Sequence, residues 1–74
     1  MIELIRSNDV VLLSFAESLM KEAGIMYFIA DRHTSIAEGS MGLIQSRFLV
    51  DEDFADEAKK ILINAGLSDE LYNG

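Results

Sequence analysis

Cysteine, proline and tryptophan are all absent from this sequence, and histidine occurs once. Without cysteine the chain can form neither a disulfide nor a thiolate metal site. No apolar stretch approaches the ~20 residues that a membrane-spanning helix needs. The first residues, Met1 to Arg6, lack the basic start and long apolar stretch of a secretory signal. We therefore expect a cytoplasmic protein with no membrane partner.

Positive charge is also scarce. Thirteen acidic residues face six basic ones, which gives a net charge of −7. Such a surface repels phosphate backbones and no basic stripe offsets it, so we expect no nucleic-acid partner. The acids are densest over 51–57, where they suit a helix start and a solvated face. A cation site or a docking patch for a basic partner are the alternatives for this cluster.

Half of the residues are hydrophobic, which suits one globular domain. A core of this size supplies only ~3–5 kcal/mol without a staple. Self-association or a protein partner is therefore expected on physical grounds, and a homodimer is one form of it. The domain is expected to span 1–67, and the short polar segment 68–74 to form a C-terminal tail or a vestigial fourth strand.

The hydrophobic pattern predicts a strand over 2–6 and then a helix over 10–23. Ser7 or Asn8 can cap the start of this helix, and Gly24 ends it. The residues expected on the buried face of the helix are Leu12, Phe15, Ala16, Leu19 and Ala23.

The second half of the chain repeats strand and helix patterns. A continuous apolar strand is predicted over 25–30 and a third strand over 42–50, most clearly over 47–50. From Asp51 the helical period returns and lasts to the cap Gly66. The residues expected on the buried face of this second helix are Phe54, Ala58, Ile61, Leu62 and Ala65.

The order β-α-β-β-α predicts an α+β fold, a ferredoxin-like split β-α-β sandwich. Its two helices cover one face of an antiparallel sheet, and its fourth strand is short or missing. The other face of the sheet stays uncovered. Either Tyr27 and Ile29 or Met26 and Phe28 must point to that open face. An exposed apolar patch marks an interaction site. The candidate interface residues are Met26, Phe28 and Leu49.

The sequence offers little catalytic chemistry, and we expect no enzyme. His33 is the only histidine, and no Gly-x-Ser-x-Gly elbow accompanies the serines near it. The segment 39–42 holds two glycines but no lysine, so turn geometry explains it better than phosphate binding. Asp31, His33 and Glu38 form a poor ligand set, so no metal and no cofactor are expected.

The connection over 31–45 is the best candidate for a binding loop, because compact domains seldom keep long connections that bind nothing. Positive side chains lie in and beside it, where an anionic ligand or an acidic partner would bind. Structural pairing of these arginines with neighbouring acids is the competing interpretation. The candidate ligand- or partner-binding residues are Arg32, His33, Glu38, Ser40 and Arg47.

The order and spacing of several segments resemble a known family over residues 1–67. These segments are the Asn8-Asp9 helix start, Glu22 to Ile25, Glu38 to Gly42 and Leu49 to Asp53. The family consists of small prokaryotic proteins described as putative signal transducing proteins. The resemblance implies a ferredoxin-like fold similar to the PII nitrogen-regulatory proteins, in which the connection between strands 2 and 3 contacts partners.

These observations favour a regulatory, signal-transducing interaction module that acts through protein–protein contacts. The alternative is a small-molecule effector domain with an anion site near the 31–45 connection. The two differ in a simple respect, since only the second should respond to small ligands.

Overall fold

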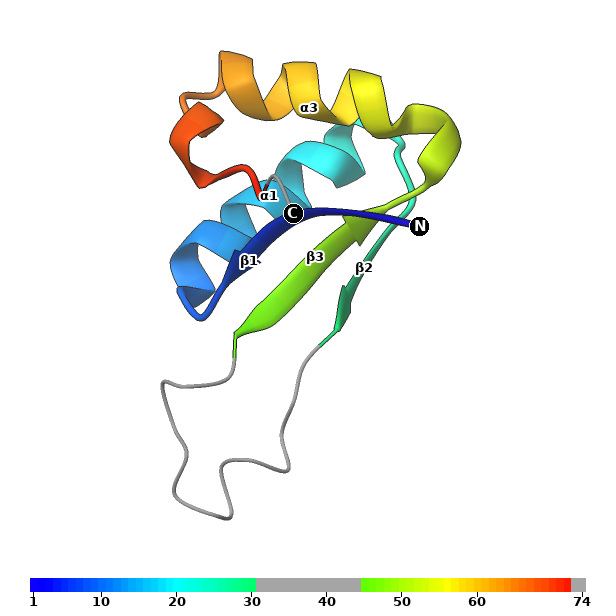
Figure 1. Ribbon diagram of the computed structural model, residues 1–74. Helices are drawn as coiled ribbons and strands as arrows, with labels where there is room; N and C mark the ends of the chain where they lie inside the picture. The colour runs from blue at the N-terminus through cyan, green and yellow to red at the C-terminus, as the bar shows by residue number, and fades with distance from the viewer. Residues whose placement is uncertain (31–44, 73–74) are drawn as a thin grey trace.

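The computed structural model describes residues 1–30 and 45–72. Within these residues the chain forms two α-helices and three strands, with two short 3-10 turns after the last of these strands (Figure 1). In chain order the elements are β1 (Ile2–Ser7), α1 (Val10–Ala23), β2 (Tyr27–Ala30), β3 (Ser46–Val50), η1 (Glu52–Phe54), α3 (Ala55–Asn64) and η2 (Ser68–Glu70).

The three strands form an antiparallel sheet in the order β1-β3-β2. Both helices lie on the same face of this sheet (Figure 1). The α+β class and the antiparallel sheet with two helices are as the sequence predicts, and the arrangement is compatible with a ferredoxin-like fold. β3 is the central strand because it pairs with both β1 and β2.

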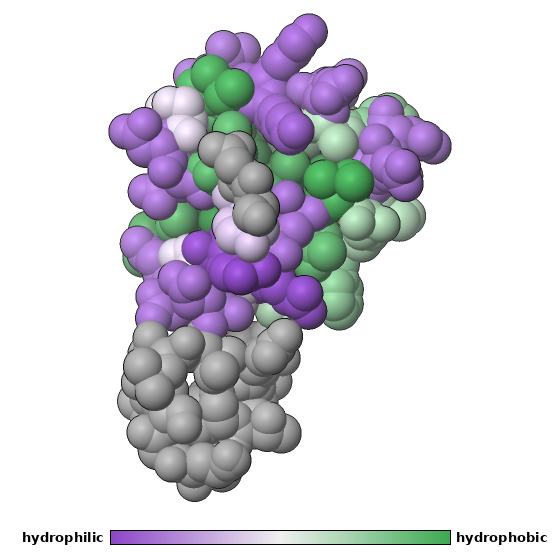
Figure 2. Space-filling model, viewed as in Figure 1, coloured by the Kyte–Doolittle hydropathy of each residue, from purple (hydrophilic) through white to green (hydrophobic). Residues whose placement is uncertain are grey.

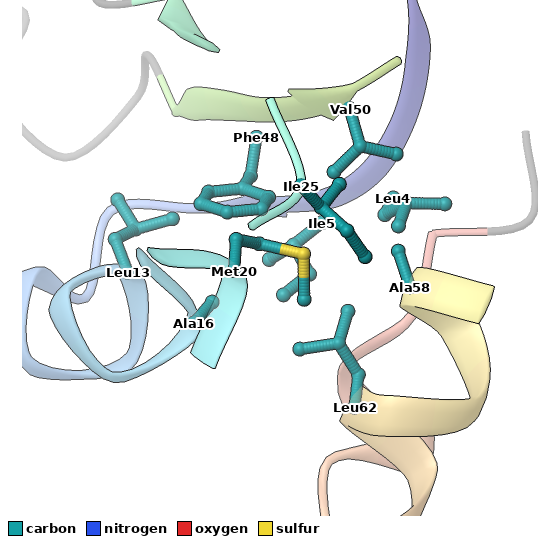
Figure 3. Close-up of a cluster of buried hydrophobic side chains, with 10 residues drawn as sticks. All are labelled: Leu4, Ile5, Leu13, Ala16, Met20, Ile25, Phe48, Val50, Ala58 and Leu62. Atoms are coloured by element: carbon teal, nitrogen blue, oxygen red, sulfur yellow. The ribbon is translucent and has the colours of Figure 1, made fainter. Parts of the chain in front are cut away.

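The core lies between the helices and the inner face of the sheet (Figure 3). Phe48 and Val50 of β3 are fully buried and meet side chains from β1 and both helices. In the described part of the chain the buried residues are Leu4, Ile5, Leu13, Ala16, Met20, Ile25, Phe48, Val50, Ala58 and Leu62. All ten are apolar, so burial of hydrocarbon surface holds this domain together.

The buried face of α1 agrees in part with the one that the sequence predicts, since Ala16 is buried and Leu12 and Leu19 pack against the core. Leu13, Ala16 and Met20 are its buried residues, and Phe15 is 44% exposed. The predicted buried face is therefore turned around the helix axis relative to the observed one. The reason is that α1 is apolar at most positions, so the helical period of its apolar residues does not single out one face. On α3 the buried residues are Ala58 and Leu62, both of which were expected. Phe54, also expected on the buried face, lies in η1 before this helix and is 45% exposed.

The caps of α1 also differ in part from expectation. Asp9 itself is the N-cap, since its carboxylate accepts hydrogen bonds from the backbone N–H groups of Val11 and Leu12 at 2.9 and 3.2 Å. Gly24 ends the helix at a φ of 74°, as predicted. The N–H of Ile25 then donates to the carbonyl of Met20, so Ile25 belongs to the cap and β2 begins only at Tyr27.

A β-bulge in β1 changes which residues share a face. Glu3 pairs with Leu49 but Ile5 pairs with Phe48, so the register shifts between them. As a result two consecutive residues, Leu4 and Ile5, are both buried. A regular strand would have turned one of them to the solvent.

After α3 the chain returns to the edge of β1. Leu71 forms a single antiparallel bridge with Ile5, and the N–H of Tyr72 donates to the carbonyl of Leu4 at 2.7 Å. The preceding Ser68–Glu70 segment is a 3-10 turn. The side chain of Leu71 packs against the core, so this segment adds one bridge beside β1.

The described residues contain no helix that is long and apolar enough to cross a membrane.

Candidate functional site: the open face of the sheet

The sheet face opposite the helices carries the candidate site, and we call it the outer face. Strand register places its residues in two neighbouring rows across β1, β3 and β2. The first row is Glu3, Leu49 and Phe28. The second row is Arg6, Arg47 and Ala30. In Figure 2 the most hydrophilic side chains lie over β1 and β3, and hydrophobic side chains line the side where β2 runs.

The β2 side of the outer face is apolar. Phe28 is 58% exposed and is the cross-strand partner of Leu49, which is partly buried. Met26, just before β2, is 69% exposed, and its carbonyl accepts a hydrogen bond from the N–H of Asp51. Tyr27 and Ile29 point to the core instead. The choice that the sequence left open for this strand is therefore settled, with Met26 and Phe28 outward.

The β1 side of the outer face is charged, and its central group is Arg6. The guanidinium of Arg6 donates to both carboxylate oxygens of Glu3, at 2.8 Å from Nε and 3.2 Å from Nη2. The same guanidinium lies 4.2 Å from the ring centroid of Tyr72. The hydrogen bond to Glu3 raises the pKa of Arg6 above its ordinary value, so the group stays charged.

The bulge in β1 is what brings Glu3 and Arg6 together. Residues three apart point to opposite faces of a regular strand, because the side-chain period of a strand is two. The extra residue of the bulge restores a common face. The fixed position of Arg6 on the outer face thus follows from a backbone irregularity.

Arg47 occupies the centre of the outer face. It is the direct cross-strand partner of Arg6 on one side and of Ala30 on the other. Its Nε is buried and has no hydrogen-bond partner among the residues that the structure describes. Two guanidinium groups directly opposite each other repel unless an anion lies near them. An anionic group that binds beside Arg6 and Arg47 would therefore relieve their repulsion.

Comparison with family models decides the family. The model described as "Putative prokaryotic signal transducing protein" matches residues 1–66. The chain belongs to this family. A search among curated proteins finds no significant match.

The structure brings together some of the residues that the sequence singled out. Met26, Phe28, Leu49 and Arg47 share the outer face. The remaining candidates lie outside the described residues, and these are Arg32, His33, Glu38 and Ser40.

Sequence reasoning missed three outer-face residues, Glu3, Arg6 and Tyr72. No sequence signal marks the bulge that puts Glu3 beside Arg6. For Tyr72 the one available signal was the apolar–aromatic pair Leu71-Tyr72, which has a strand-like alternation of an inward and an outward side chain.

Elsewhere, one polar contact anchors β2 to α1. The hydroxyl of Tyr27 donates to the carboxylate of Glu17, and the Tyr27 ring stacks on Phe48 with centroids 5.5 Å apart. The hydrogen bond to Glu17, with burial and the Glu17 charge adding to it, raises the pKa of Tyr27 to about 12. Glu17 also lies 3.8 Å from the Lys21 ammonium, the i,i+4 position on the same helix.

In the part of the chain that the structure describes, no three His, Cys, Asp or Glu side chains cluster as a metal site would require.

Proposed function

We propose that this chain is a non-enzymatic regulatory module of signal transduction, acting in the cytoplasm through protein–protein contacts at its outer face. The observation that carries the proposal is the composition of that face. Exposed Met26 and Phe28 lie beside Leu49, and two arginines lie next to them. Aromatic residues, methionine and arginine are the types enriched in the centres of protein interfaces. The family name supports a signal-transducing role.

Electrostatics adds a preference for the kind of partner. The chain carries a net charge of −7, and its acids are densest over 51–57, directly after β3. Of the two arginines on the outer face, Arg6 already has Glu3 as its partner. The Nε of Arg47 is buried and has no acceptor among the residues that the structure describes. A partner surface that combines apolar side chains with a carboxylate would satisfy both halves of the face.

The proposal can be tested by placing a photoreactive phenylalanine analogue at Phe28 in cells that express the chain. Cross-linked protein products at Phe28 are expected, because an interface residue lies within reach of its partner. The matched control carries the analogue at Val11 on α1, which is 78% exposed. Equal labelling at the two positions, or none at Phe28, would contradict an interface on the outer face.

Arg47 supports a second candidate function, a small-molecule effector domain whose ligand has an anionic group. A carboxylate or phosphate that binds beside Arg47 would relieve the repulsion between its guanidinium and that of its cross-strand neighbour. Arg6, directly opposite, adds a second positive charge. This site would lie beside the 31–45 connection, as the sequence analysis predicts for the alternative function.

Thermal shift against nucleotides, amino acids and 2-oxo acids distinguishes the two functions. A ligand at ~100 times its dissociation constant stabilises a protein by ~2.7 kcal/mol, which in a domain this small moves the melting midpoint by roughly 10 °C or more. Under the effector hypothesis one compound gives such a shift with the parent chain and not with Arg47→Met. Under the interaction hypothesis the panel stays flat.

A further inference from the structure

We propose that the outer faces of two copies of this chain pack against each other in a twofold-symmetric dimer. The inference rests on the proposed function, since it names the partner of the same face. It comes from the pattern of side chains across the sheet, which is complementary to itself in both size and charge.

The complementarity in size follows from the strand register. One row reads Glu3, Leu49, Phe28 from β1 to β2, and the next reads Arg6, Arg47, Ala30. A twofold axis that lies in the interface, perpendicular to the strands and midway between the rows, brings each row over the other row of the second copy. The large, 58% exposed Phe28 then lies over the small Ala30.

The complementarity in charge follows from the same axis. Glu3 of the second copy lies over Arg6 and next to Arg47. A carboxylate has enough lone pairs to accept from several donors, so each Glu3 can bridge Arg6 of its own chain and the arginines of the other copy. The long apolar stem of Arg47 meets Leu49 of the second copy.

The other twofold axis within the interface, parallel to the strands, gives a poor arrangement. This axis places each row over the same row of the second copy, with the order of the strands reversed. Arg47 then stacks on Arg47 of the second copy, and Phe28 lies over its Glu3. Like charges would meet at the centre, and an aromatic ring would cover a carboxylate. The register therefore selects the perpendicular axis.

The expected dimer is weak. Three strands spaced about 4.8 Å apart and about five residues long at about 3.3 Å each give a face of only about 15 by 17 Å. Such a face, about 250 Å² on each copy, is far smaller than the ~1,200–2,000 Å² that a stable interface buries in total, so this association is transient. We expect micromolar or weaker affinity, with monomer and dimer exchanging at working concentrations.

The contact between Phe28 and Ala30 of the second copy can be tested by exchanging these two residues within the chain. Sedimentation equilibrium over a hundredfold concentration range measures the dimerisation constant of four chains: parent, Phe28→Ala, Ala30→Phe and the double variant Phe28→Ala/Ala30→Phe. Each single change should weaken the dimer by about tenfold or more, through an unfilled space or a collision between rings. In the double variant large again meets small, and affinity should return toward that of the parent. Circular dichroism verifies that all four chains are folded.

The outcomes separate this inference from the function on which it rests. A parent chain that stays monomeric, or a double variant no tighter than the singles, overturns the dimer. If the photoreactive analogue at Phe28 then captures a different protein, the interaction function stands and only the identity of the partner was wrong. A monomeric chain with no cross-link at Phe28 contradicts both. Cross-links between two copies, together with recovery in the double variant, support both.

Discussion

Arg6 and Arg47 are directly opposite partners in the pairing of β1 with β3. Arg6 is fixed by two hydrogen bonds to Glu3 and by the ring of Tyr72. Arg47 has a buried Nε with no partner in the described part of the chain. A sheet built for stability alone would not place two cations in this relationship.

Replacement of Arg47 by methionine should therefore stabilise the isolated monomer. The change removes a like charge opposite Arg6 and an unsatisfied donor while it keeps an apolar stem of similar length. We expect a gain of about 0.2–1 kcal/mol in the free energy of unfolding, measured by urea denaturation at low protein concentration. Arg6→Met is the matched control, and it should lower stability because it breaks the contacts with Glu3 and Tyr72. A loss of stability in Arg47→Met would mean that this side chain has a partner within the chain.

Tyr27 should ionise late in an alkaline titration. Its bond to the Glu17 carboxylate raises its pKa from 10.0 to about 12. Because the folded-state pKa lies above the unfolded one, this contact contributes stability that is fully present below pH 10 and is lost as the pH rises through about 12. The chain has two tyrosines, so ultraviolet absorbance of tyrosinate follows both.

Two variants assign the late step in that titration. Tyr27→Phe should remove it altogether, and Glu17→Gln should move it toward the ordinary range because the negative charge that opposes ionisation is gone. A late step that persists in Tyr27→Phe would contradict the assignment.

Leu71→Ala should destabilise the domain although it lies in the polar C-terminal segment. Leu71 packs against the core and forms the bridge with Ile5. Because Leu71 is only partly buried, we expect a loss toward the low end of the ~2–5 kcal/mol range for leucine-to-alanine changes. Asp69→Ala, at an exposed position two residues earlier, is the control and should change stability by less than about 0.5 kcal/mol. Equal effects of the two changes would show that the segment does not pack.

The two faces of α1 can be distinguished by a pair of alanine substitutions. Met20 is fully buried, so Met20→Ala should cost about 2–5 kcal/mol. In a domain with ~3–5 kcal/mol in total, this change should leave much of the chain unfolded at room temperature. Phe15→Ala, at a position that is 44% exposed, should cost markedly less. Far-ultraviolet circular dichroism with urea measures both, and the reverse order would favour the rotation of the helix that the sequence alone predicts.

The sequence predicted what depends on local signals. Alternation and helical period gave the element order, and Gly24 marked a helix end that needs a positive φ. The capping residue was wrong by one or two positions, because Ser7, Asn8 and Asp9 are all competent caps and only the path of the chain selects Asp9. The prediction that Phe15 is buried was also wrong, because an apolar helix offers several faces of similar hydrophobicity.

The candidate site was predictable only in part. The sequence indicates that an apolar strand leaves some of its residues uncovered. From the sequence alone we predicted Met26, Phe28, Leu49 and Arg47 as site residues. Which of them share a face depends on register, and register is a property of paired strands. The family of the chain was also recognised from the order and spacing of its segments.

By itself, then, the sequence determined the net charge of −7, the order of the described helices and strands, and the apolar character of their core. Each of these depends on nearby residues or on composition alone. Only the tertiary structure decided that Glu3, Arg6 and Arg47 meet on one face beside Tyr72. The physical reason is the bulge between Glu3 and Ile5, because one extra residue reverses the faces of every side chain beyond it.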